Sequence, residues 1–407
     1  MMLRVLSPLH IGNGNQLTPV DIYPEQDRVY VLDIDKLIDD LQNLGISLEE
    51  ILHLLKNPPG DRYVWKGYID ELNLNPKDYA RYTLRTHGTP GKESMQIREF
   101  IKLNERPYVP GSSVKGALRT AVLYKVLKEC GDSATAMNLV SRFDRKLAEK
   151  IGWSNHVVEF YVEYLLNELQ KEEAAKQRGK RYNFDRKRAD DLLEAIVFGM
   201  EPDRRSGVRY EPKRDPLRAL IVRDSQPVGR RHLAVYRVDV IGNPQPIPIW
   251  VEALEPGTAT EIEMKIEAKV LRLNSGHFNG LLWECLENYG KPWEVFEDFL
   301  WKAVNEFYDE VIKTELTELS RFGKYETNVK SFYSSLKSHD GHLLRLGWGS
   351  GWLATTVGIL LRKEGKWEGV RRKLGLGRNP QSGKLSSYFP KTRRLADGLP
   401  MGWVVLQ

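Results

Sequence analysis

Three segments of the sequence combine glycine with side chains that can contact anions or nucleic-acid bases. In the first, Leu6–Gly14, a short apolar run leads into His10 and then into Gly12, Asn13 and Gly14. Backbone N–H groups of a Gly-Asn-Gly turn can form a concavity for an anion, and a histidine beside it can donate to a phosphate or act as an acid or base. The other interpretation is that His10 is structural, at the end of a strand, and the sequence leaves both open.

The second segment, 108–120, places a strand before a turn of three small residues, Gly111, Ser112 and Ser113. A helix expected from about Lys115 would direct free N–H groups and two hydroxyls at one point, which is the chemistry of a phosphate contact. Lys115 and Arg119 lie four residues apart, on one helical face. The lysine precedes the second glycine, so this is not a nucleotide P-loop. A simple capping turn with surface cations remains the alternative.

The third segment follows Arg345 and alternates three glycines, Gly347, Gly349 and Gly351, with bulkier residues. Glycine lets a ligand approach the backbone closely, and Trp348 could stack on a base of a single strand. The spacing differs from the dinucleotide fingerprint, so the segment predicts no nucleotide cofactor. Trp348 and Trp352 could instead pack in the core.

The net charge of +6 is concentrated near the end of the chain. Residues 362–394 contain eleven Lys or Arg and two Glu, a charge of +9, which leaves −3 for the rest of the 407-residue chain. Such a segment favours a polyanionic partner, although a solvated basic surface would look the same. Four arginines of this segment are expected to contact that partner: Arg371, Arg372, Arg393 and Arg394.

The elements that must position these segments indicate an α+β protein with antiparallel sheets. Strand-like runs at 20–23 and 28–32 predict a hairpin, and residues 95–103 and 261–272 alternate as strands do. Long amphipathic helices are expected at 156–178 and 293–319. The second of these helices has an acidic face, which we interpret as solvated or as a contact for a basic neighbour.

The chain length suggests two domains, and the proline-rich stretch at 244–256 is the best boundary. This gives an N-terminal domain, 1–250, with a helical insertion at about 130–200, and a C-terminal domain, 251–407. Residues 200–218 are rich in proline, glycine and charge, which predicts a loop or extended hairpin that projects from the body.

Two cysteines, Cys130 and Cys285, are too few for a disulfide framework or a zinc site and fit a reducing compartment. No uncharged stretch is long enough for a membrane helix, so we expect a cytoplasmic protein without a membrane partner. No metal or cofactor motif occurs, so none is expected.

Taken together, "SPLHIGNG", "YVPGSSVKGALRTA", "LGWGSGW" and the closing "FPKTRRLADGLPMGWVVL" resemble the RAMP superfamily of CRISPR proteins. The likeness is greatest to the subunits that cap the backbone filament of type III-A effector complexes at the 3′ side of the crRNA. The resemblance is carried by both ends of the chain and the segment near residue 110. It is weak over 130–200 and 275–340.

The resemblance implies two RRM-like (ferredoxin-like) domains, the first with large helical insertions. It also implies a non-catalytic subunit that binds crRNA, contacts the adjacent RAMP backbone subunit and supports crRNA maturation, with trimming done by a separate nuclease. The alternative is a metal-independent endoribonuclease that processes crRNA precursors with His10 as its acid or base.

Overall fold

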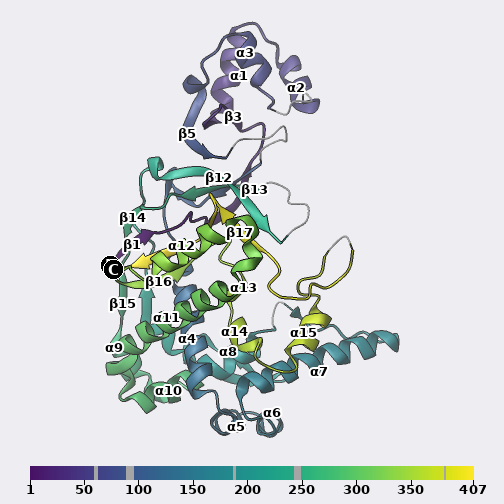
Figure 1. Ribbon diagram of the computed structural model, residues 1–407, viewed down its shortest axis with the longest axis vertical. Coiled ribbons are helices and arrows are strands. Elements are labelled where there is room, and N and C mark those ends of the chain that lie inside the picture. The colour runs from purple at the N-terminus through teal and green to yellow at the C-terminus, as the bar shows by residue number, and fades with distance from the viewer. Residues whose placement is uncertain (59–62, 89–95, 187–188, 243–248, 380–381) are drawn as a thin grey trace.

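Two β-sheets lie at the middle of the molecule, with a helical lobe at one end and a larger layer of helices at the other (Figure 1). This computed structural model describes residues 1–58, 63–88, 96–186, 189–242, 249–379 and 382–407. The predicted α+β class is confirmed.

The smaller sheet joins the two ends of the chain. Its strands are antiparallel and follow the order β14 (Ala259–Glu261), β1 (Met2–Val5), β19 (Trp403–Leu406) and β16 (His342–Arg345). Leu3 faces Leu406 across the central pair. Every residue of β19 is buried, because helices cover one face of the sheet and the body of the protein covers the other (Figure 1).

The larger sheet is curled around one long strand, β12 (Leu233–Ile241). Its order is β2 (Gly12–Leu17), β6 (Ile97–Phe100), β13 (Ile249–Leu254), β12, β5 (Ala80–His87), β4 (Arg28–Leu32) and β3 (Ile22–Pro24). The first half of one β12 edge pairs with β5, and the second half pairs with β17 (Arg393–Ala396), which also pairs with β18 (Leu399–Pro400). Most pairs are antiparallel as predicted, but β12–β5 and β13–β6 are parallel.

Each sheet takes strands from both sides of residue 250. The smaller sheet consists of C-terminal strands and β1. The larger sheet consists of N-terminal strands, β13, which crosses residue 250, and the C-terminal strands β17 and β18. A cut at residue 250 therefore does not separate the two sheets. Residues 243–248 of the predicted proline-rich boundary lie outside the described residues.

The lobe at the top of Figure 1 has a hydrophobic core of its own. It contains α1 (Ile34–Asn43), α2 (Leu48–Lys56) and α3 (Lys66–Glu71), which pack on the hairpin of β3 and β4. Trp65 is fully buried at its centre. Both halves of the Ser47–Glu50 capping box are formed at the start of α2.

The opposite end of the molecule is mostly helical. The main helices are α4 (Gly111–Cys130), α5 (Ser133–Ser141), α6 (Arg145–Ile151), α7 (Val157–Gln177), α8 (Asp191–Phe198), α10 (Leu281–Tyr289) and α11 (Pro292–Thr317). After α11, the chain forms α12 (Glu326–Leu336), α13 (Trp352–Thr355), α14 (Gly358–Leu361) and α15 (Trp367–Leu374). The apolar stripe of α11 packs on α4, where Tyr124 meets Phe307 at 5.2 Å between ring centroids.

Two local predictions are only partly correct. The strand expected at 261–272 is divided into the end of β14, the short β15 (Met264–Ile266), which pairs with β11 (Leu220–Val222), and α9 (Ala268–Leu273). Residues 200–218 do not project from the body. They begin with a hairpin of β9 (Met200–Asp203) and β10 (Gly207–Tyr210), which packs on α8 and buries Met200 and Val208 fully.

Cys130 at the end of α4 and Cys285 in α10 form a disulfide, so the two cysteines are not free thiols. The structure thus holds one covalent link within the helical layer, where the sequence suggested none. Among the described residues, no helix has the length and apolar character needed to span a bilayer.

Candidate nucleic-acid interface

The first and third glycine-rich segments lie against each other, although more than 330 residues separate them. The loop after β16 crosses the segment after β1, and the Trp348 N–H donates to the His10 carbonyl oxygen at 2.8 Å. A Cβ atom on Gly347 would lie 2.2 Å from that same oxygen, and the φ of Gly347 is +73°. Only glycine permits this crossing, so at this position the loop's composition is explained by packing.

His10 is part of this crossing rather than of an open pocket. Its side chain is buried, and Nδ1 lies 2.6 Å from the Glu252 carbonyl oxygen, to which it donates. Burial lowers the pKa of His10 to about 4, and the charges of Arg98 and Lys102 act in the same direction. A buried, neutral imidazole with a backbone partner favours the structural interpretation of His10.

Gly12, Asn13 and Gly14 do not form the anion-binding turn that the sequence suggested. They lie in β2, an exposed strand at the edge of the larger sheet, whose register shifts between Gly12 and Gln16. The Asn13 amide donates to Glu99 at 3.3 Å. This edge strand lies beside β6, which carries Arg98 on its surface.

Trp348 lies against two guanidinium groups that share no carboxylate. The Cζ atoms of Arg98 and Arg394 are 4.6 Å and 4.4 Å from a Trp348 ring centroid. In the part of the chain that the structure describes, neither arginine has a carboxylate within ion-pair distance. The Arg394 Nε is buried without a hydrogen-bond partner among these residues.

We call Arg98, Trp348 and Arg394 the Trp348 clamp. Burial lowers the pKa of Arg394, and the positive charge of Arg98 lowers it further. The ring face of Trp348 attracts both cations, but it does not cancel their mutual repulsion. An anion that contacted both guanidinium groups would offset the repulsion between them. A phosphate suits this role, because its oxygens match the planar donors of arginine.

The second glycine segment is closed by the protein itself. α4 starts at Gly111, four residues before the predicted start, so the Gly-Ser-Ser turn is the first turn of the helix. The Gly111 N–H donates to the Asp224 carboxylate at 2.8 Å, and a Cβ on Gly111 would lie 2.4 Å from the Val222 carbonyl oxygen. An internal carboxylate thus occupies the place expected for a phosphate. Ser112 is exposed, and Ser113 is half-buried.

The two cations of this segment also have internal partners. The Lys115 ammonium donates to the Leu220 carbonyl oxygen at 2.6 Å, and burial lowers its pKa. Arg119 forms ion pairs with Asp215 and Glu194 and lies 3.6 Å from the Phe198 ring centroid. Both therefore hold α4 to the residues around 215–220. The helix itself packs against β16 and α13, beneath the Trp348 loop.

Several predicted arginines are structural in the same way. Arg345 and Arg393 are buried on either side of Glu315 of α11, at 3.5 Å and 2.8 Å. Arg393 also reaches Glu318 at 2.8 Å. Arg371 is buried and bonded to Glu368 and to the Ser386 carbonyl oxygen.

Of the predicted cations, Arg394 belongs to the clamp, and Arg372 is largely exposed with Glu368 at 3.4 Å. Gly349 packs on Met401, and Gly351 faces open space.

The sequence does not predict Arg98 as a site residue because it belongs to no motif. The only signal was its place on the polar face of the alternating strand at 95–103, of which Met95 lies outside the described residues.

The described residues contain no group of three or more His, Cys, Asp or Glu side chains arranged to hold a metal ion. The Trp348 clamp is built from β6, β17 and the loop after β16.

Comparisons with known proteins show which family the chain resembles. A family model described as the RAMP superfamily matches residues 2–354. Among curated proteins, the chain is 24% identical to CRISPR system Cms protein Csm5 of Methanocaldococcus jannaschii, over 98% of this chain and 87% of that protein. It is 21% identical to the Csm5 protein of Streptococcus thermophilus, over 78% of this chain and 74% of that protein.

Two solved structures are much closer in sequence. The crystal structure of T. onnurineus Csm5 is 60% identical over the full length of both chains, with a TM-score of 0.85. A chain in the cryo-EM structure of a Csm–crRNA–target RNA ternary complex of a type III-A CRISPR-Cas system is 59% identical. That match covers 100% of this chain and 99% of the other, with a TM-score of 0.86.

Proposed function

This chain belongs to the RAMP superfamily, and on that premise we propose that it is a non-catalytic crRNA-binding subunit of a type III-A CRISPR interference ribonucleoprotein. It caps the backbone filament in the cytoplasm, contacts the adjacent RAMP backbone subunit and supports crRNA maturation by a separate trimming nuclease. The 59% identity to a chain of a Csm–crRNA–target RNA complex supports this assignment.

The observation that carries the proposal is the Trp348 clamp. Two guanidinium groups converge on one indole without a carboxylate partner in the described residues, on a surface flanked by the exposed strand β2. Phosphate contacts of this kind supply much of the affinity of RNA-binding proteins and read no sequence. The clamp thus holds the crRNA backbone, with Gly12, Asn13 and Gly14 along its edge.

The remaining predicted contacts have separate roles in the proposal. Ser112, at the start of α4, and Arg372, on α15, are exposed and add contacts to the RNA. The buried cations Arg119, Arg345, Arg371 and Arg393 position these surfaces through their carboxylate partners.

We also propose that the two sheets are the cores of two RRM-like domains, corresponding to residues 1–250 and 251–407. In this description, each domain lends strands to the other: β1 to the second, and the last four residues of β13 together with β17 and β18 to the first. The helices of 130–200 are an insertion in the first domain. The smaller sheet, with four antiparallel strands, supports this description.

The proposal is tested with the Arg98→Ala/Arg394→Ala double variant and a labelled single-stranded RNA over a salt series. Each phosphate contact contributes about 0.7 to the slope of log affinity against log salt, so the slope should fall in magnitude by about 1.4. The matched control is Arg28→Ala/Arg81→Ala, two arginines of the same sheet that already pair with Asp27 and Glu105. An unchanged slope in the double variant, or no RNA binding by the unaltered protein, would contradict the proposal.

A further inference from the structure

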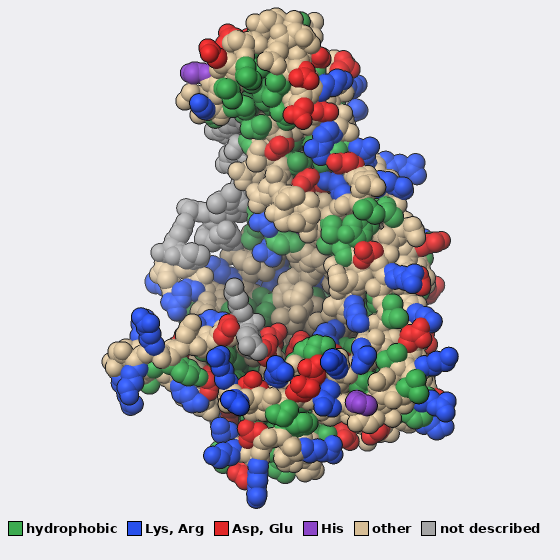
Figure 2. Space-filling view, turned by 180° about the vertical axis from the view of Figure 1, so that it is seen from behind, with side chains coloured by type: hydrophobic (Ala, Val, Ile, Leu, Met, Phe, Trp, Pro, Cys, Tyr) green, Lys and Arg blue, Asp and Glu red, His purple; other side chains and the backbone are tan. Residues whose placement is uncertain are grey.

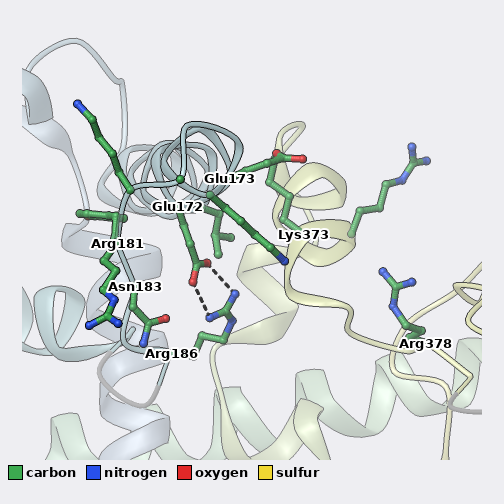
Figure 3. A pocket seen from close by; sticks show the side chains of 13 residues that line it. Glu172, Glu173, Arg181, Asn183, Arg186, Lys373 and Arg378 are labelled. Atoms are coloured by element: carbon green, nitrogen blue, oxygen red, sulfur yellow. Dashed lines mark hydrogen bonds and ion pairs between the residues drawn. The ribbon is translucent and has the colours of Figure 1, made fainter.

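A basic cleft lies in the helical layer, away from every segment that the sequence singled out as glycine-rich. It has a volume of about 870 Å³ and is bounded by the end of α7, the segment 179–186 that follows it, and α15 with Arg378 (Figure 3). Its cations come from two parts of the chain that are nearly 200 residues apart: Lys176, Lys180, Arg181, Arg186, Arg372, Lys373 and Arg378.

Two carboxylates in the cleft fix its walls. Glu172 holds Arg186 at 2.7 Å, and Glu173 holds Lys373, so one pair braces the segment after α7 and the other joins α7 to α15. The Lys373 ammonium lowers the pKa of Glu173, so that this carboxylate stays ionised. These two ion pairs use Arg186 and Lys373. The other five lining cations are not paired with either Glu172 or Glu173.

All five of these cations are exposed, so a ligand can reach them. Within the described ranges, Lys180, Arg181 and Arg378 have no carboxylate at ion-pair distance, and Arg378 donates only to the Gly383 carbonyl oxygen at 2.9 Å. Figure 3 shows Arg181 and Arg378 on opposite sides of the cleft. In Figure 2, the projecting end of α7 carries Lys and Arg side chains above and below it.

An exposed aromatic ring lies among these charges. Tyr182 is 42% exposed, and its hydroxyl donates to Glu168, which anchors the ring against α7. Cations on both walls with an accessible aromatic ring on one of them are typical of surfaces that bind single-stranded nucleic acid, where backbone charge and base stacking act together. An acidic protein segment would use the cations but would have no need of the ring.

We propose that this α7–α15 cleft binds the phosphate backbone of single-stranded RNA and stacks one base on Tyr182. It is a second contact, distinct from the Trp348 clamp. The inference rests on the proposed function only in requiring that the protein binds RNA. The cleft gives α7 a role: the helix carries one cationic wall past the body, and α15 carries the other.

The test is the Lys180→Ala/Arg181→Ala/Arg378→Ala variant of the full chain, with an unstructured single-stranded RNA over a salt series. Three lost phosphate contacts should reduce the slope of log affinity against log salt by about 2 and weaken binding at low salt at least about tenfold. The matched control removes the same charge from the far side of the helical layer, by Lys269→Ala/Arg272→Ala/Lys291→Ala, and should keep the slope of the unaltered protein.

A second measurement does not depend on how the variant folds. Lysine acetylation of the unaltered protein, read by mass spectrometry, should show Lys180 protected by RNA and Lys269 unprotected. Tyr182→Ala should weaken binding with little change in the salt slope, because it removes a ring and no charge.

The outcomes separate this inference from the proposed function. If the unaltered protein binds RNA but the triple variant keeps its slope and Lys180 is not protected, the cleft inference is wrong and the proposed function stands. If the triple variant keeps its RNA affinity but fails to join the effector complex, the cleft holds an acidic protein surface, which also overturns the inference. If the unaltered protein does not bind RNA, both proposals fall.

Discussion

Gly347 and Gly14 show how one residue type can serve two different needs. Both have positive φ, +73° and +94°, but a Cβ on Gly347 would meet the His10 carbonyl oxygen, whereas a Cβ on Gly14 would meet nothing within 4 Å. Gly347→Ala should therefore lower the free energy of unfolding by about 3 kcal/mol or more, and Gly14→Ala by about 1–2 kcal/mol, the conformational cost alone.

Chemical denaturation of the two variants measures this difference. Equal losses would mean that the loop after β16 can move away from His10. The same experiment separates packing from binding, because Gly14→Ala leaves the core intact and can then be assayed for RNA affinity.

The burial of His10 predicts a pH dependence of stability. Its pKa is lowered to about 4 in the folded protein, from about 6.5 in the unfolded chain, so the unfolded state binds more protons between these values. The contribution is fully present above pH 6.5 and is lost as the pH falls to 4, by up to roughly 3 kcal/mol. Denaturant unfolding between pH 4 and 7 should show this loss, and His10→Gln should reduce it.

At the residue scale, the sequence indicated that the segments near residues 10 and 348 matter, but not that they touch each other. The contact depends on the pairing of β1 with β19 and of β19 with β16, which brings the two ends of the chain together. No local pattern reports such pairing. The same reason explains why Arg98 was missed.

Some of the acidic side chains of α11, and Glu318 just after it, pair with cations of the chain itself. Glu315 and Glu318 hold Arg345, Arg362 and Arg393. Glu310 pairs with Lys363 at 3.6 Å. Of the acidic face that the sequence predicted, Glu306 and Glu310 therefore have basic neighbours within the chain, Lys125 and Lys363.

This arrangement makes Glu315 a test of how β17 and α11 are held together. Glu315→Gln leaves Arg345 and Arg393 buried with less compensation, and breaking a buried pair in this way costs about 3–5 kcal/mol. Glu297→Gln, on the exposed face of the same helix, should change the unfolding free energy by less than about 0.5 kcal/mol. Thermal and denaturant unfolding measure the free energy of unfolding of both variants. Similar losses in the two variants would show that the buried network of Glu315 contributes little to stability.

At the element scale, periodicity predicted the long helices and the hairpin of β3 and β4 well. The errors fall where local patterns compete with tertiary contacts. Residues 111–114 resemble a turn in the sequence, but they form the first turn of α4. Glycine is needed at position 111 because the Val222 carbonyl oxygen lies where a Cβ would be. The alternation of apolar and polar residues at 261–272 corresponds to a strand only in β15, and the residues after it form the helix α9.

The whole molecule explains why a charge count along the sequence overstated the RNA-facing charge. Most cations of 362–394 pair with carboxylates of α7, α11 and α15, as Lys366 does with Glu163. In the described structure, four cations of this segment have no carboxylate partner: Arg378, Lys384, Lys391 and Arg394. Arg394 lies in the Trp348 clamp, and Arg378 lies in the α7–α15 cleft. The basic segment therefore contributes to two separate surfaces. Other parts of the chain supply the remaining cations, Arg98 in the clamp and residues 176–186 in the cleft.

If both surfaces hold the same RNA at once, their contributions should add, because distant sites without shared partners act independently. The variant that combines Arg98→Ala and Arg394→Ala with Lys180→Ala, Arg181→Ala and Arg378→Ala removes five cations. On a long single strand, its salt slope should fall by about 3.5, the sum of the two separate changes. A short strand that reaches one surface should respond to only one set of substitutions. A combined change no larger than the greater of the two would instead mean that the surfaces bind alternative stretches of RNA, and the crRNA would then not run from the clamp to the cleft.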